Sequence, residues 1–189
     1  RGSGTGSSLC GGVDVLSGIS PDNVRSVFVF ESALDAMALY RKNRIQIGDR
    51  AALVSLGGTF SDRQITGVME RFPNARAFDC FDNDLAGRIY GLRMMALQEG
   101  IQMKISRTDG GIRIEAKGKV FETDMKRPLL AQVARQLNIR YRMGQWLPPN
   151  AFKDWNDCLL NRPMEPVISP HKEEREQNLS EQRNKGRKI

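Results

Sequence analysis

Short apolar runs alternate with amphipathic segments through the first half of the chain, and this alternation narrows the choice of fold. Three runs are typical of buried strands: Ser26–Phe30 (SVFVF), Ala51–Leu56 (AALVSL) and Arg76–Phe81 (RAFDCF). The segments between them carry apolar residues at helical spacing. Strands that alternate with helices imply crossover connections and a mostly parallel sheet. The sequence therefore predicts an α/β fold, in which helices flank a mostly parallel central sheet.

The remaining elements are predicted from the same patterns. Helices are expected from Ala33 to Tyr40, fading into the basic segment 41–44, then from Ser61 to Phe72 and from Leu85 to Gln98. Ile101–Ile105 is expected to be the fourth strand of the same series. Further expectations are a strand at Val13–Leu16, a hairpin at Ile112–Phe121, a helix at Pro128–Leu137, a strand at Ile139–Tyr141 and a helix at Lys153–Leu160.

Composition suggests three regions along the 189 residues. Residues 1–25 form a Gly/Ser-rich lead-in, residues 26–162 one domain with a basic hairpin and helix inserted at about 107–150, and residues 163–189 a polar tail that we expect to be disordered. No apolar run could span a membrane and no signal peptide is evident, so we expect a cytoplasmic protein. Three scattered cysteines and one histidine exclude a structural zinc site.

Positive charge is concentrated in the middle of the chain. The formal net charge is +7, and residues 101–145 hold ten basic and four acidic residues. A local basic excess favours a polyanionic partner, although an ordinary solvated face has the same composition. The side chains that could line a groove for DNA or RNA include Lys117, Lys119, Arg140 and Arg142.

Acidic residues stand where the predicted parallel strands end. Glu31 follows the first strand, and Asp82 and Asp84 follow the third. Ligands of such sheets bind at this edge, and paired carboxylates suit Mg²⁺ or Mn²⁺. Gly87 has no side chain and so allows a backbone segment or a phosphate to approach closely, and Arg88 could contact a phosphate. Ordinary capping roles for these acidic residues remain the alternative, and Asp79 is expected to be structural or to lie behind the metal ligands.

Four segments together resemble the motifs of Toprim domains. They are ESALDA (Glu31–Ala36), SLGGTF (Ser55–Phe60), FDNDLAGR (Phe81–Arg88) and KDWNDCL (Lys153–Leu159). Their order and spacing are similar to those of the primase-type Toprim proteins of conjugative plasmids and other mobile elements. The resemblance covers residues from about Val27 to Leu160 and implies a Rossmann-like Toprim fold. Ser32 departs from it, because a glycine usually follows the first glutamate.

The resemblance also implies roles for individual residues. Glu31 would act as the general acid/base, and Asp82 and Asp84 would bind Mg²⁺ or Mn²⁺. A second metal site would use Asp154 and Asp157, with Lys153 nearby as a phosphate contact. The residues expected at nucleic-acid or nucleotide phosphates are Gly57, Gly58, Thr59, Gly87, Arg88 and Lys153.

The function implied is Mg²⁺-dependent nucleotidyl or phosphoryl transfer by a primase-like domain of a DNA replication or mobilization protein. Its partners would be single-stranded DNA or a primer-template, nucleotides, and other domains or replication and mobilization proteins. The chain shows no zinc-binding module and no evident polymerase subdomain, so we expect primer synthesis only as part of a longer protein. A non-catalytic nucleic-acid-binding module and a Toprim-type nuclease remain alternatives. A topoisomerase would need a nucleophilic tyrosine on another domain, and a receiver domain would need a Thr/Ser and a Lys at later strand ends.

Overall fold

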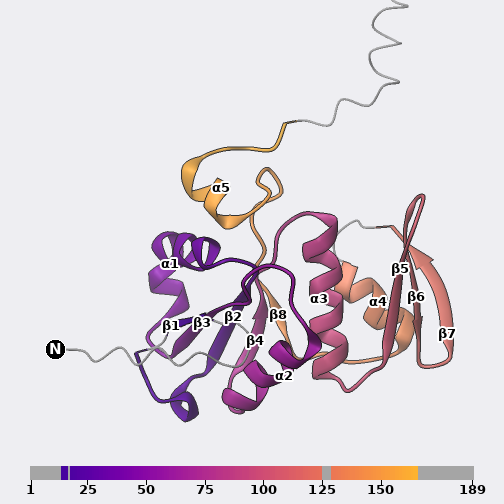
Figure 1. The fold of residues 1–189 in the computed structure, drawn as a ribbon, viewed down its shortest axis with the longest axis horizontal. Coiled ribbons are helices and arrows are strands. Elements are labelled where there is room, and N and C mark those ends of the chain that lie inside the picture. Colours follow the sequence, from indigo (N-terminus) through magenta and orange to yellow (C-terminus); the bar gives the residue numbers. More distant parts are fainter. Residues whose placement is uncertain (1–13, 17, 125–128, 166–189) are drawn as a thin grey trace, which may run out of the picture.

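The computed structural model describes residues 14–16, 18–124 and 129–165, which form two β-sheets and the helices around them (Figure 1). The predicted lead-in lies largely outside the described residues, as does the tail from residue 166. Within the described part of the chain, no helix has both the length and the apolar character needed to cross a bilayer.

The larger sheet is mostly parallel, as predicted. Its strand order is β1-β3-β2-β4-β8, and the pairs β2·β3, β2·β4 and β4·β8 are parallel, whereas β1 is an antiparallel edge strand. The strands are β1 (Asp14–Leu16), β2 (Ser26–Phe30), β3 (Ala51–Ser55), β4 (Arg76–Asp79) and β8 (Gly144–Gln145). The first three predicted buried strands are therefore confirmed, and all three run in the same direction at the centre of the sheet.

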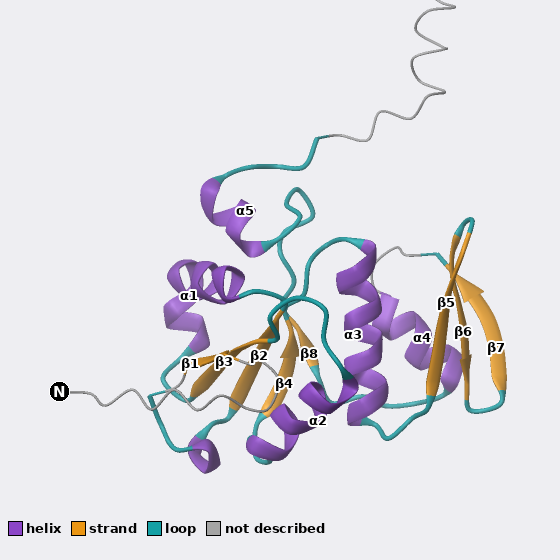
Figure 2. Ribbon diagram, viewed as in Figure 1, coloured by secondary structure: helices purple, strands orange, loops and turns teal. Residues whose placement is uncertain are grey.

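Helices cover both faces of this sheet (Figure 2). Side chains alternate between the faces along β2: Val27 and Val29 belong to one core, and Phe28 and Phe30 to the other. The first core includes residues of α2, α3 and α4, and the second includes residues of α1 and α5. The helices are α1 (Ala33–Ile47), α2 (Asp62–Arg71), α3 (Leu85–Gln98), α4 (Leu129–Leu137) and α5 (Trp155–Leu160), with a short 3₁₀ turn, η1, at Pro21–Asn23.

The first helix is longer than its apolar pattern suggested. It continues past the basic segment to Ile47, with one non-helical residue at Asn43. Ile47 is buried in the second core, and the Lys42 ammonium donates to the carbonyl oxygen of Cys158 in α5 at 3.4 Å. Packing against α5 and the sheet thus extends a helix whose local sequence gave a weak signal.

Two strand predictions are wrong. The segment at Ile101–Ile105 does not join the parallel sheet. It overlaps β5 (Met103–Thr108), which pairs antiparallel with β6 (Gly111–Ala116), and β6 pairs with β7 (Lys119–Thr123) in a separate sheet. Only two residues connect β5 to β6, and a parallel pair needs a much longer crossover.

The other wrong strand is Ile139–Tyr141, which is not a strand in the structure. The chain joins the sheet a few residues later, at β8. Glycine at position 144 permits this, because an added Cβ would lie 2.5 Å from the ring of Phe78 on β4. Close approach to that ring therefore requires glycine at this position of the edge strand.

Candidate functional site

Glu31 follows β2 directly and is held at the carboxyl edge of the sheet by its neighbours. The amide of Gly58 donates to the Glu31 carbonyl oxygen at 2.8 Å, and the amide of Asp82 donates to Glu31 Oε1 at 3.4 Å. Chain segments far apart in sequence therefore bring Glu31 to the loop that carries Asp82 and Asp84, here called the aspartate loop. This is the proximity on which the predicted metal site depends.

The Gly57-Gly58 loop has a positioning role in this arrangement. Both glycines have positive φ angles, 74° and 98°, which other residues rarely adopt. The amide of Gly58 is committed to Glu31 and the amide of Gly57 to Ser55 Oγ, whereas Thr59 is exposed. The loop thus fixes the backbone of Glu31. Of the three residues predicted to contact phosphates, Gly57, Gly58 and Thr59, only Thr59 has a side chain, and it is exposed to solvent.

Asp82 and Asp84 lie in the tight turn between β4 and α3. Asp84 caps α3, because its Oδ1 accepts from the amide of Gly87 at 2.9 Å. Gly87 packs directly on the aspartate loop, since an added Cβ would lie 2.3 Å from the carbonyl oxygen of Asp82. The Asp82 side chain is 12% exposed and that of Asp84 39%. Gly87 therefore serves a close backbone approach, which is one of the two roles predicted for it.

Lys153 faces both aspartates. Its Nζ lies 3.6 Å from Asp82 Oδ2 and 3.7 Å from Asp84 Oδ2. The next residue, Asp154, caps α5 by accepting from the amide of Asp157 at 2.7 Å, so both predicted second-site aspartates lie at the start of that helix. The structure thus brings Lys153 and Asp154 to the edge of the sheet where Glu31 and Asp82 lie.

Burial, and after it the charges of neighbouring carboxylates, disfavours the ionised forms of Glu31 and Asp82. Burial is the main cause that raises the pKa of Glu31 to about 7, with further increases from the charges of Asp84 and Asp35. Burial also raises the pKa of Asp82 to about 7, followed by the charge of Glu31. The Lys153 ammonium lowers both pKa values without cancelling these effects. At this edge of the sheet, the positive charge of Lys153 therefore only partly offsets the cost of ionising the two carboxyl groups.

The donor set suits a hard divalent cation. Among the residues that the structure describes, no three Asp, Glu, His or Cys side chains are gathered closely enough to hold a metal ion by themselves. Mg²⁺ commonly uses only one or two carboxylates and completes its shell with water and substrate phosphates. Asp82 and Asp84, with an ammonium already between them, fit that pattern. A cation held by these two residues would offset the burial and the charge repulsion that raise the pKa of Asp82 and Glu31.

The four predicted basic groove residues lie elsewhere. The carbonyl oxygen of Arg142 accepts from Arg76 Nε, at the start of β4, and its amide donates to Glu99, just after α3. Lys119 Nζ donates to the Gln136 carbonyl oxygen near the end of α4, and Lys117 lies in the turn between β6 and β7, at the lower right of Figure 1. Arg140 is exposed in the same connection as Arg142. These residues lie toward the amino edge of the sheet, away from Asp82.

Three residues at the site were missed from sequence. Asn83 bonds the segment around Lys153, and Gln145 Nε2 donates to Asp79 Oδ2 at 2.9 Å. Asp35 accepts from the amide of Asn156, which ties α1 to α5. Asp79 is 1% exposed and also accepts from the amide of Phe81, in agreement with the structural role expected of it. The only sequence signal for Asn83 was its place between two aspartates.

Comparison with known families agrees with this geometry. Residues 28–111 match a family model described as Toprim-like. Domains of this kind generally bind a divalent metal such as Mg²⁺ and act in nucleic-acid processing. The matched range includes Glu31, Asp82 and Asp84 but ends before Lys153. No curated protein and no solved structure matches the chain significantly.

Proposed function

We propose that the Toprim-like domain of this chain carries out Mg²⁺-dependent nucleotidyl transfer of the primase type, as part of a longer protein. The observation that supports this most directly is the convergence of Glu31, Asp82 and Asp84 at the carboxyl edge of one parallel sheet, with Lys153 against both aspartates. Catalysis of this kind needs little beyond positioning and charge stabilisation. A compact set of carboxylates beside a cationic side chain supplies both.

Each residue has a role in this proposal. Asp82 and Asp84 hold the cation, which when bound neutralises phosphate oxygens and lowers the pKa of an attacking hydroxyl. Glu31, in contact with the Asp82 amide, is placed to take the proton from that hydroxyl and return it to the leaving group. Lys153 turns from the aspartates to a phosphate oxygen of the substrate. Asp154 and Asp157 are proposed ligands of a second cation at the start of α5.

The proposed partners follow from the same chemistry. They are single-stranded DNA or a primer-template, nucleotides, and the other domains or replication and mobilization proteins of a mobile-element system. We also propose that residues 26–162 act as one domain, in which the insertion at about 107–150 leads the chain back to the central sheet at β8, and that the protein works in the cytoplasm. The four exposed basic residues, Lys117, Lys119, Arg140 and Arg142, would contact nucleic acid at a distance from the chemistry.

The test uses the parent-length protein with a single-stranded template, nucleoside triphosphates and Mg²⁺ or Mn²⁺. Template-dependent products are expected from the wild type and should be lost in Glu31→Ala. The matched control is Glu70→Ala, an exposed glutamate on α2, which should retain activity. Cleavage of the template without synthesis would identify a nuclease. If neither the wild type nor any variant gave a product, the proposal of catalysis would be overturned in favour of a binding module.

Metal binding is measured separately by Mn²⁺ titration. Affinity should fall in Asp82→Ala and in Asp84→Ala, and should be unchanged in Asp109→Ala, an exposed aspartate in the turn between β5 and β6. Unchanged affinity in both site variants would show that the acidic residues are not the metal ligands and would overturn the proposal.

A further inference from the structure

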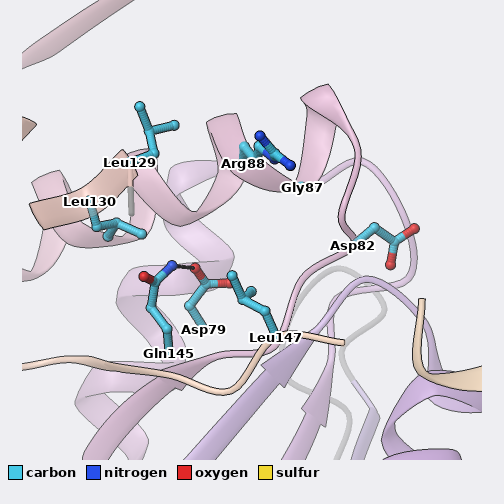
Figure 3. A pocket seen from close by; sticks show the side chains of 8 residues that line it. All are labelled: Asp79, Asp82, Gly87, Arg88, Leu129, Leu130, Gln145 and Leu147. Carbon is cyan, nitrogen blue, oxygen red and sulfur yellow. Dashed lines mark hydrogen bonds between the residues drawn. The ribbon is translucent and has the colours of Figure 1, made fainter. Parts of the chain in front are cut away.

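A cavity of about 250 Å³ lies beside the acidic residues (Figure 3). Its walls come from the start of α3, the start of α4 and the chain around β8, and Asp82 lies at one side. The roles assigned to Glu31, Asp82 and Lys153 do not use this cavity. Its size lies just under the roughly 300 Å³ at which typical small-molecule pockets start, so it suits a small ligand.

One wall carries a buried guanidinium nitrogen that has no hydrogen-bond partner in the described part of the chain. Arg88 lines the cavity from the first turn of α3. Its Nε is buried and has no hydrogen-bond partner within the described part of the chain. The acidic groups nearby are already engaged, since Lys153 faces Asp82 and Gln145 bonds Asp79. A buried donor left unsatisfied is costly, so this one favours an anionic ligand.

A second wall of the cavity is apolar. Leu129 and Leu130 begin α4, are 4% and 2% exposed, and line the cavity together with Leu147. Figure 3 shows Leu129 and Leu130 on one side and Asp82 on the other, with Arg88 between them along the upper wall. Inorganic phosphate has no apolar surface that could pack against the three leucines. The combination suits a ligand with an anionic part and a flat apolar part.

The floor of the cavity is fixed by internal bonds. Asp79 is held by Gln145 and by the amide of Phe81, so its carboxylate is satisfied from within the protein. Gly91 on α3 allows this packing, because an added Cβ would lie 2.4 Å from Asp79 Oδ2 and 3.5 Å from Leu130 Cδ1. The guanidinium and the leucines therefore border the same pre-formed space.

We propose that this cavity binds a nucleoside phosphate, with its phosphate on Arg88 and its base against Leu129, Leu130 and Leu147. The inference rests on the proposed function, because it names the nucleotide as the substrate and gives it a subsite beside the metal-binding aspartates. Nothing in the apolar wall selects one base, so purine and pyrimidine nucleotides are both accepted. Binding through Arg88 and the leucines does not require the cation.

The test is calorimetric titration of the protein with AMP and with CMP in the presence of EDTA, which removes the contribution of a metal. Both should bind saturably and more tightly than inorganic phosphate or adenosine, each of which fills only half of the site. Arg88→Ala should weaken AMP binding by about tenfold or more, the size expected for a lost charge-assisted hydrogen bond. Leu147→Phe, which fills the apolar half, should weaken AMP binding and leave phosphate binding unchanged.

The matched control is Arg93→Ala, an arginine on the same helix that pairs with Asp62 outside the cavity. It should bind AMP as the wild type does. The inference is overturned if AMP binds no better than phosphate, or if Arg88→Ala and Leu147→Phe both bind AMP normally. Each variant is checked for folding by its urea unfolding curve, and the two substitutions in different walls provide independent tests.

Failure of the subsite and failure of the catalytic proposal are distinguishable. Glu31→Ala should lose transfer while it retains AMP binding in EDTA. Transfer by the wild type without any AMP binding would overturn the subsite and leave the catalytic proposal standing. AMP binding that depends on Arg88, without transfer, would support the subsite and contradict the catalytic proposal.

Discussion

The amide of Asn83 donates a 2.7 Å hydrogen bond to the carbonyl oxygen of Lys153. The Asn83 side chain reinforces this link, because its Nδ2 lies within hydrogen-bond distance of the carbonyl oxygens of Pro148, Pro149 and Phe152. The residue between the two aspartates thus fastens the segment that carries Lys153. The ammonium is positioned by this link and by the cap of α5 as well as by its attraction to the carboxylates.

Replacing this link should cost stability and loosen Lys153. In Asn83→Ala, the carbonyl groups of Pro148, Pro149 and Phe152 lose this side-chain donor, and we expect the free energy of unfolding to fall by about 1–3 kcal/mol. Urea unfolding measures the change. The matched control is Asn74→Ala, whose exposed side chain makes a single long bond to the Asp22 carbonyl oxygen and should change stability little. Equal effects of the two substitutions would show that Asn83 does not hold the segment.

Gly87 should not tolerate a methyl group. In Gly87→Ala the new Cβ would clash with the Asp82 backbone, so the aspartate loop must move. We expect a loss of about 1–3 kcal/mol in the free energy of unfolding, as in other overpacked sites, together with weaker Mn²⁺ binding. Gly67→Ala on α2 is the control, because nothing lies within 4 Å of its added Cβ. That substitution should stabilise the helix by roughly 0.5–1 kcal/mol.

Lys153 should compete with the metal ion. Its ammonium faces the same two aspartates that are proposed to bind the cation, so Lys153→Met should bind Mn²⁺ more tightly than the wild type. The measurement belongs at pH 9, where protons no longer compete for Glu31 and Asp82, whose pKa values are about 7. Lys104→Met, which removes an exposed lysine from β5, should leave affinity unchanged. Weaker binding in Lys153→Met would show that the lysine assists the metal.

Stability without metal should fall as the pH rises through the range set by these carboxyl groups. The pKa of Glu31 is raised from 4.5 to about 7, so the folded state holds its proton where the unfolded chain has released it. Stability is highest below the unfolded pKa and declines until the folded pKa is passed. The free energy of unfolding, measured in EDTA at pH 5 and at pH 8, should decline less in Glu31→Gln than in the wild type. An identical decline in the two proteins would show that ionisation of Glu31 does not destabilise the folded state.

Much of the central fold could be predicted from local patterns. The helix predicted from Leu85 to Gln98 has these bounds in the structure, where Asp84 caps its first turn. The proximity of Glu31 and Asp82 could be predicted from the sequence, because parallel strands put their carboxyl ends at one edge of the sheet. The family match over residues 28–111 covers the same region.

The misplaced elements depend on contacts that no local pattern contains. The segment Ile101–Ile105 was assigned to the wrong sheet because it follows the alternation of strands and helices before it, and the two-residue turn from β5 into β6 shows the antiparallel pairing instead. The edge strand at Gly144–Gln145 has no strand signal and is selected by packing on Phe78. The links made by Asn83 and Gln145 join segments distant in sequence, which spacing alone cannot reveal.

The late return of the chain to the sheet at β8 has a practical consequence. The matched Toprim-like range ends at residue 111, yet the sheet gains its last strand only at Gly144–Gln145, and Lys153 follows after that. A shortened protein that stopped at residue 111 would keep all three acidic side chains and lose Gln145 beneath Asp79 together with the ammonium opposite Asp82. The site therefore needs both the matched range and the segment from Gly144 to Lys153, and the two must be expressed in one chain.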